Sequence, residues 1–174
     1  MDNNIRKHIR EIIDFPKKGI SYKDITPLLM DVDISNYITS ELVDRINHLK
    51  IDAIVGVESR GFLYGFLLAN RIGVPFVPIR KAGKLPSKTI KCKYDLEYGA
   101  AEIEIHSNDI KSDWNVLIHD DLLATGGTAC AAAELIKMAN ANVAGFAFII
   151  NLTYLKPYER LNLYSDNIIS LVDY

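Results

Sequence analysis

Two adjacent aspartates followed by a pair of glycines form the most chemically suggestive part of this sequence. In residues 116–128 (VLIHDDLLATGGT), Asp120 and Asp121 follow an apolar run, and Gly126 and Gly127 come shortly after them. Two carboxylates can accept hydrogen bonds from the two hydroxyls of a vicinal diol. Glycines let the backbone approach a phosphate closely, and a helix that begins after them adds free N–H donors and a favourable dipole. This spacing therefore predicts a site for a sugar phosphate.

Other uses of two carboxylates at the end of a strand fit this sequence less well. A nucleoside triphosphatase would need a G-x-x-x-x-G-K-[ST] loop and a dinucleotide-binding enzyme would need G-x-G-x-x-G, and the sequence contains neither motif. A hydrolase would use the two carboxylates as an acid and a base. The adjoining glycine loop would then have no purpose, so we favour the sugar phosphate.

Positive charge is concentrated in one part of a chain whose formal net charge is −2. A negative net charge argues against a general nucleic-acid binder. Residues 59–94, however, contain no Asp or Glu. Basic side chains recur throughout that stretch: Arg60, Arg71, Arg80, Lys81, Lys84, Lys88, Lys91 and Lys93. They predict either a solvated basic face or a site for a small polyanion.

The order of the apolar segments predicts one α/β domain. The chain has 174 residues, which fits a single domain over 1–174. Helices are expected at 3–14, 35–49, 61–72 and 128–139, with Ser35 as the cap of the second. Runs typical of buried parallel strands occupy 51–57, 75–80, 115–119 and 143–152. This alternation favours a parallel sheet flanked by helices, in which ligands bind at the carboxyl ends of the strands.

Two further segments interrupt the alternation. Residues 88–94 and 100–106 predict an antiparallel arm that is closed by a loop and inserted into the parallel core. No apolar run reaches the about 18 residues of a membrane span, and the first 15 residues lack the continuous apolar core of a secretion signal. Cys92 and Cys130 have no CxxC spacing, so we expect reduced thiols and a cytoplasmic protein.

Residues 116–128 resemble, in length, residue types and order, the phosphoribosyl diphosphate signature of the type I phosphoribosyltransferases. The resemblance implies that Asp120 and Asp121 hold the ribose hydroxyls. It also implies that the 5-phosphate is bound by the following loop, which consists of Ala124, Thr125, Gly126, Gly127 and Thr128.

Four other segments resemble the adenine phosphoribosyltransferases within that family. They are FPKKGISYKDITPLL (15–29), ESRGF (58–62), IRKAGKLP (79–86) and LEYGAAEIEI (96–105). The resemblance implies a parallel-sheet core at about 35–174, a flexible arm at 82–106 and a small N-terminal base-binding hood at about 1–34. It implies a homodimer that converts adenine and phosphoribosyl diphosphate to AMP and pyrophosphate, without a nucleic-acid or membrane partner. Mg²⁺ would arrive mainly with the substrate. A transferase for another purine base and a non-catalytic sensor of phosphoribosyl diphosphate remain as alternatives.

The same resemblance assigns roles around the leaving group. Ser59 and Arg60 would bind pyrophosphate at a turn with a non-proline cis peptide at Glu58–Ser59. Arg80, Lys81 and Lys84 would oppose the charge of the pyrophosphate as its bond to the sugar breaks. In the loop of the arm, Glu97 would handle a proton on the purine, and Tyr98 would help to seal the site. Ordinary surface roles for these charged residues are the alternative.

The hood would supply most of the base pocket. The ring of Tyr22 would stack on the purine, and the backbones of Ser21 and Lys23 would bond to its N1 and amino group. Leu152 would cover the opposite face of the base, with core packing as the alternative. Two residues depart from the family pattern. His119 replaces an aliphatic residue and is expected to be packed, and to point away from Asp120 because neighbours in a strand alternate. Asn151 replaces an acidic residue.

Overall fold

A central sheet of seven strands forms the core of the structure, a computed structural model that describes residues 3–96 and 99–174. The strands run in the spatial order β5 (Thr89–Leu96), β6 (Gly99–His106), β4 (Phe76–Lys81), β3 (Ala53–Val57), β7 (Asn115–Leu123), β8 (Asn142–Asn151) and β9 (Ile168–Asp173). From β4 to β9 all neighbouring strands are parallel, whereas β6 pairs antiparallel with both β4 and β5. The parallel-sheet core and the inserted antiparallel arm are thus both confirmed.

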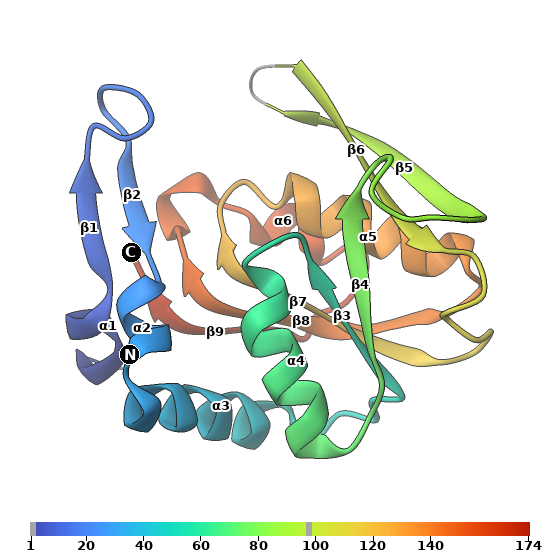
Figure 1. Cartoon of the computed structure of the whole chain (residues 1–174), viewed down its shortest axis with the longest axis horizontal. Coiled ribbons are helices and arrows are strands. Elements are labelled where there is room, and N and C mark those ends of the chain that lie inside the picture. The colour runs from blue at the N-terminus through green and yellow to red at the C-terminus, as the bar shows by residue number, and fades with distance from the viewer. Residues whose placement is uncertain (1–2, 97–98) are drawn as a thin grey trace.

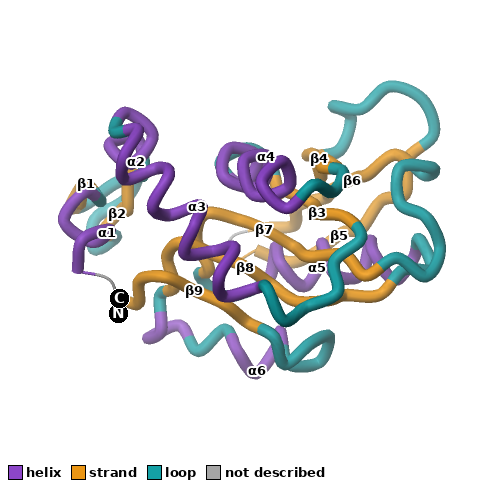
Figure 2. Tube along the Cα trace, turned by 90° about the horizontal axis from the view of Figure 1, so that it is seen from below, coloured by secondary structure: helices purple, strands orange, loops and turns teal. Residues whose placement is uncertain are grey.

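Helices cover both faces of the sheet, which is why its central strands are apolar along their length. On one face, α5 (Gly127–Met138) packs Leu135 and Ile136 into a cluster with Ile118 of β7. On the other face, α3 (Val32–Ile46) and α4 (Gly61–Ile72) pack into a second cluster that includes Leu117. Figure 2 shows the sheet edge-on between these two layers. The short helix α6 (Tyr158–Leu161) lies with α5, and Leu161 is fully buried there.

The N-terminal hood is a hairpin rather than one long helix. Helix α1 covers only Asn3–His8, and β1 (Arg10–Ile13) then pairs antiparallel with β2 (Ser21–Asp24). The predicted helix over 3–14 is therefore wrong beyond His8. Residues 10–13 are all exposed, so pairing with β2 outweighs their helical spacing of isoleucines. In Figure 1 this hairpin stands at the left, next to α2 (Thr26–Met30), and the arm of β5 and β6 stands at the upper right.

Other element boundaries also differ from the sequence-based expectation. Helix α3 is capped by Asp31, not Ser35, because the Asp31 carboxylate accepts hydrogen bonds from the N–H groups of Asp33 and Ile34 at 3.0 and 3.1 Å. Strand β7 continues to Leu123, so the two aspartates lie inside the strand instead of after it. Strand β9 and helix α6 carried no sequence prediction. None of the helices in the described part of the chain combines the length and apolarity needed to span a bilayer.

The start of α4 lies unusually close to the strand that carries the aspartates. A Cβ atom at Gly61 would come within 2.9 Å of both the Asp120 Oδ1 atom and the His119 carbonyl oxygen. Only glycine fits at that distance. The close approach is what places Arg60, the residue before α4, beside the end of β7.

We expect Gly61→Ala to lower the free energy of unfolding by about 1–3 kcal/mol, because the added methyl group must push α4 away from β7. Urea denaturation measures this. Asn70→Ala, on the exposed side of the same helix, is the control and is expected to change stability little. Equal stability of Gly61→Ala and the unmodified protein would contradict the tight contact.

Candidate active site

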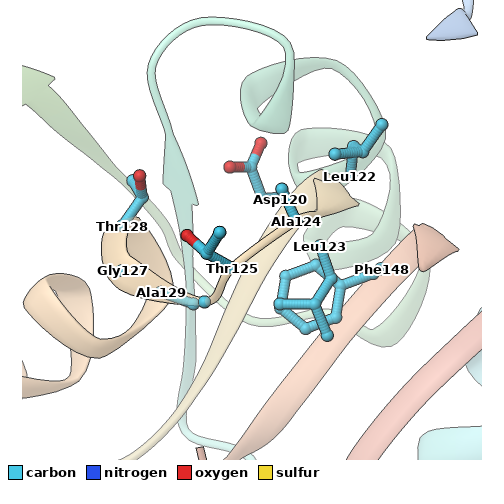
Figure 3. A pocket seen from close by; sticks show the side chains of 10 residues that line it. Asp120, Leu122, Leu123, Ala124, Thr125, Gly127, Thr128, Ala129 and Phe148 are labelled. Atoms are coloured by element: carbon cyan, nitrogen blue, oxygen red, sulfur yellow. The ribbon is translucent and has the colours of Figure 1, made fainter. Parts of the chain in front are cut away.

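A pocket at the end of β7 combines one carboxylate with the glycine loop. Its lining runs from the aspartate through the loop to the first turn of α5: Asp120, Leu122, Leu123, Ala124, Thr125, Gly126, Gly127, Thr128, Ala129 and Phe148. Figure 3 shows the Asp120 carboxylate and the hydroxyls of Thr125 and Thr128 around the same opening. The structure thus brings together Asp120 and all five residues predicted to bind the 5-phosphate.

The loop is shaped for an anion by its glycines and by the helix that follows. Gly126 has a φ of 82°, and a Cβ atom there would lie 2.7 Å from the Leu161 Cδ1 atom, so a larger residue would be both strained and in collision. Helix α5 begins at Gly127. The first N–H groups of a helix have no partner within the helix, and its dipole favours negative charge there. This geometry suits an anion, and phosphate binding by the loop stays a prediction.

Asp121 points to the other side of the strand, where it meets Arg60. The Arg60 Nε atom lies 3.0 Å from the Asp121 Oδ2 atom, and the side chain of Asp121 is only 4% exposed. Arg60 also donates through Nη1 to the Tyr22 hydroxyl at 2.7 Å and to the Lys23 carbonyl oxygen at 3.2 Å. One arginine therefore joins the acidic strand β7 to strand β2 of the hood. Asp121 itself does not line the pocket.

The two neighbouring aspartates make ionisation unfavourable in this strand. Burial raises the pKa of Asp120 well above its usual value, and the adjacent Asp121 charge raises it further. Burial also raises the pKa of Asp121, although the positive charge of Arg60 acts in the opposite direction. The Asp120 carboxylate accepts a hydrogen bond from the Asp121 N–H group at 2.9 Å. Hydroxyl donors from a substrate would relieve this unfavourable charge.

Glu58 holds together the segments that are expected to bind the diphosphate, a role that the sequence did not predict. The Glu58–Ser59 peptide is cis, as predicted. Glu58 accepts hydrogen bonds from Nε and Nη2 of Arg80, both at 3.2 Å, and from the Lys81 N–H group at 2.8 Å. The hydrogen bonds from Arg80 lower the pKa of Glu58. Glu58 thus connects the turn before α4 to the basic end of β4.

A second glutamate holds the loop that carries Lys84. Glu104 is 1% exposed and accepts hydrogen bonds from the N–H groups of Lys84 and Leu85, both at 2.9 Å. The Lys91 ammonium lies 3.6 Å from the same carboxylate. The alternation of residues 102–105 placed Glu104 on a strand, but it gave no sign that this carboxylate is buried and bonded to a loop. The side chains of Lys81 and Lys84 remain exposed.

The arm approaches the phosphate loop. The Thr128 hydroxyl lies 3.4 Å from the hydroxyl of Tyr94, which belongs to β5. Glu97 and Tyr98, the residues expected to move a proton and to seal the site, lie outside the described residues.

Among the expected base-binding residues, Tyr22 packs its ring edge-on against Phe15 with 5.3 Å between centroids. Next to it, the Lys23 side chain is only 7% exposed, and its ammonium is held by Glu11 at 2.9 Å and by the Ser21 hydroxyl at 3.2 Å. Only the backbone of Lys23 is therefore suited to contact a base. Leu152, 8% exposed, packs into the cluster beneath α3 and α4, so core packing accounts for part of its role.

Both residues that depart from the family pattern are buried. His119 packs against Gly65 of α4, away from the pocket, and burial lowers its pKa to about 4, so its imidazole is neutral at pH 7. Asn151 donates to the Tyr158 hydroxyl at 2.6 Å and to the Asp173 carboxylate at 3.0 Å. It joins the ends of β8 and β9. No cluster of three or more potential metal ligands exists among the described residues.

Comparison with known proteins agrees with this geometry. The family model described as "Phosphoribosyl transferase domain" matches residues 21–167. The adenine phosphoribosyltransferase of Clostridium botulinum (strain Loch Maree / Type A3) is 50% identical over 171 residues, covering 98% of each chain. The chain belongs to the adenine phosphoribosyltransferase family. The crystal structure of the family member from Thermoanaerobacter pseudethanolicus is 46% identical, with a TM-score of 0.94 and 98% of each chain covered.

A more distant family member was crystallised with ligands. The adenine phosphoribosyltransferase of Saccharomyces cerevisiae, in complex with an imino-altritol bisphosphate and adenine, is 38% identical, has a TM-score of 0.89 and covers 96% of each chain. The resemblance inferred from residues 116–128 and from the four other segments is therefore confirmed over nearly the whole chain.

We predict that Asp120→Asn stabilises the free protein while it weakens binding of the sugar phosphate. Asparagine keeps the acceptor for the Asp121 N–H group but removes one of two like charges. Because the folded-state pKa of Asp120 is raised, the unmodified protein loses stability as pH rises above the usual aspartate range, and the variant avoids that loss. The gain, of the order of 0.5–2 kcal/mol, should be larger at pH 7 than at pH 4 when measured by thermal unfolding. A gain that is independent of pH would contradict the raised pKa.

Proposed function

We propose that this protein transfers the 5-phosphoribosyl group of phosphoribosyl diphosphate to N9 of adenine, which releases pyrophosphate and forms AMP. The observation that carries the proposal is the pocket in which Asp120 faces the phosphate loop, while the neighbouring Asp121 is joined through Arg60 to the hood. Full-length relatives that are named adenine phosphoribosyltransferases support the choice of base.

The phosphoribosyl group is held at both of its ends. The loop from Ala124 to Thr128 receives the 5-phosphate at the start of α5, and Asp120 and Asp121 accept hydrogen bonds from the ribose hydroxyls. Two fixed ends leave the anomeric carbon in one position relative to the hood. Such positioning converts a bimolecular displacement into a nearly unimolecular one.

The leaving group departs toward the basic side of the site. As the bond from C1 to the diphosphate oxygen breaks, its electron pair stays with pyrophosphate and the sugar becomes cationic. Residues on this side stabilise the growing negative charge on pyrophosphate: Ser59, Arg60, Arg80, Lys81 and Lys84. Glu58 and Glu104 orient the segments that carry these cations.

Mg²⁺ suits this site as an ion that the substrate brings in. Hard oxygen ligands are available from the Asp120 carboxylate at the pocket, but the described residues offer no cage of three or more ligands. The ion would supply partial neutralisation of the diphosphate, and its remaining ligands would be substrate oxygens.

The base is recognised by the hood. Tyr22 stacks on the purine, the backbones of Ser21 and Lys23 bond to its polar edge, and Leu152 contacts its other face. Glu97 accepts the proton that adenine loses when N9 attacks C1, and Tyr98 closes the arm over the reacting groups, which excludes water from the cationic sugar.

The working form is a cytoplasmic homodimer. Three large apolar side chains are exposed on helix α4: Leu63, Phe66 and Leu67. Met30 is exposed on the neighbouring helix α2. The two helices are in contact, because the Tyr64 hydroxyl of α4 donates a hydrogen bond to the Leu28 carbonyl of α2. An exposed apolar surface of this kind is suited to pack against a second copy. Both cysteines are free, as is usual in a reducing compartment.

A panel of bases tests the reaction and its specificity. With phosphoribosyl diphosphate and Mg²⁺, the purified protein should form the nucleotide from adenine at least about 100-fold faster than from hypoxanthine or guanine, because a buried polar edge rejects mismatched partners. Nucleotide formation is followed by liquid chromatography. If nucleotide formed faster from a 6-oxopurine than from adenine, the 6-oxopurine would be the substrate instead of adenine. If no base gave a nucleotide, the proposed transferase activity would be refuted.

Sedimentation velocity tests the dimer. The unmodified protein should sediment as a dimer, and Phe66→Glu should shift it toward the monomer, because an unpaired charge would be buried in the interface. The matched control, Asn70→Glu, adds the same charge on the polar part of α4 and should leave the dimer intact. A monomer at every concentration would contradict the proposal.

A further inference from the structure

Arg60 holds two groups of the hood at the proposed base site, the Tyr22 hydroxyl and the Lys23 carbonyl oxygen. Its Nη1 atom donates to the Tyr22 hydroxyl at 2.7 Å and to the Lys23 carbonyl oxygen at 3.2 Å, and its guanidinium carbon lies 5.1 Å from the centre of the Tyr22 ring. The Lys23 carbonyl is one of the groups expected to accept a hydrogen bond from adenine. While Arg60 holds it, adenine must compete with a charged donor.

The Nε side of the Arg60 guanidinium is paired with the Asp121 carboxylate, which is expected to bind the ribose of the substrate. Its Nε atom lies 3.0 Å from the almost fully buried Asp121 carboxylate, and this is the positive charge that opposes the raised pKa of Asp121. A diphosphate carries more negative charge than one carboxylate, and a guanidinium fork matches phosphate oxygens well. Pyrophosphate can therefore draw the Nη1 atom of Arg60 away from Tyr22 and the Lys23 carbonyl, while Nε stays beside Asp121.

A separate contact ties the hood to the rest of the protein on the other face of β2. Lys23 points to the opposite face of β2 from Tyr22, where its ammonium lies 4.0 Å from the centre of the Tyr174 ring and 2.9 Å from a Glu11 oxygen. The contact with Tyr174 attaches β2 to the residue that follows β9. The Tyr22 side is thus the side that can change partners while the hairpin remains attached.

We propose that Arg60, with Tyr22, Lys23 and Asp121, forms a latch that couples occupancy of the diphosphate site to adenine binding. In the free protein the latch keeps Tyr22 and the Lys23 carbonyl engaged, so adenine binds weakly. When a diphosphate engages Arg60, both groups become available and adenine binds more tightly. This inference rests on the proposed function and adds to it a positioning role for the Tyr22 hydroxyl.

Calorimetric titration of the full-length protein with adenine tests the latch, first without and then with saturating Mg²⁺ and pyrophosphate. This mixture cannot react, because it contains no ribose. In the unmodified protein, pyrophosphate should tighten adenine binding about tenfold, a typical coupling between two sites. Adenine should tighten pyrophosphate binding by the same factor, since linkage is reciprocal.

Tyr22→Phe keeps the stacking ring but removes the hydroxyl that accepts from Arg60. In this variant adenine should bind the free protein more tightly, and the effect of pyrophosphate should fall below about threefold. Tyr164→Phe is the matched control, because it removes a tyrosine hydroxyl that is bonded to Glu134, at 2.7 Å, instead of Arg60. It should keep the full coupling. Circular dichroism confirms that both variants are folded.

The outcomes distinguish failure of the latch hypothesis from failure of the proposed function. Normal AMP synthesis together with equal coupling, within about twofold, in the unmodified protein and Tyr22→Phe overturns the latch alone. No effect of pyrophosphate on adenine binding in the unmodified protein does the same. Failure of adenine to bind either form, with no AMP produced, overturns the proposed function and the latch with it.

Discussion

Two carboxylates side by side in a buried strand have to be compensated, and the Arg60–Asp121 ion pair supplies that compensation. Asp121 is 4% exposed, and a buried charge without a partner would cost several kcal/mol. Arg60 reaches Asp121 because it stands directly before α4, and α4 approaches β7 closely because Gly61 has no side chain. This one contact therefore links the start of α4, the charge of β7 and strand β2 of the hood.

The rest of the site follows the same pattern, in which acidic side chains keep basic segments in place. Glu58 fixes Arg80 and the backbone of Lys81, and Glu104 fixes the backbone of Lys84. Segments that are free to move would lose backbone entropy on binding an anion. Holding the segments beforehand reduces that cost. The phosphate loop needs no such partners, because its donors are backbone groups fixed by Gly126 and α5.

The sequence predicted the features that depend on local spacing. The buried strands, the arm and the phosphate loop are set by hydrophobic periodicity and by glycines, and the structure contains all of them. The hairpin at 10–24 was missed because pairing between strands decided it, not helical spacing. The burial of Glu104 and the partners of Arg60 could not be predicted. Both depend on contacts between residues that are more than 15 positions apart in the chain. Asn151 is not among the residues that line the pocket, and it bonds to Tyr158 and Asp173.

A crystal structure of the protein with ribose 5-phosphate would test the central claim most directly. The account predicts that the phosphate binds to backbone N–H groups between Ala124 and Thr128, with the ribose hydroxyls on the aspartates of β7. A sugar phosphate bound at another place, with the end of β7 and the first turn of α5 unoccupied at saturating ligand, would contradict it.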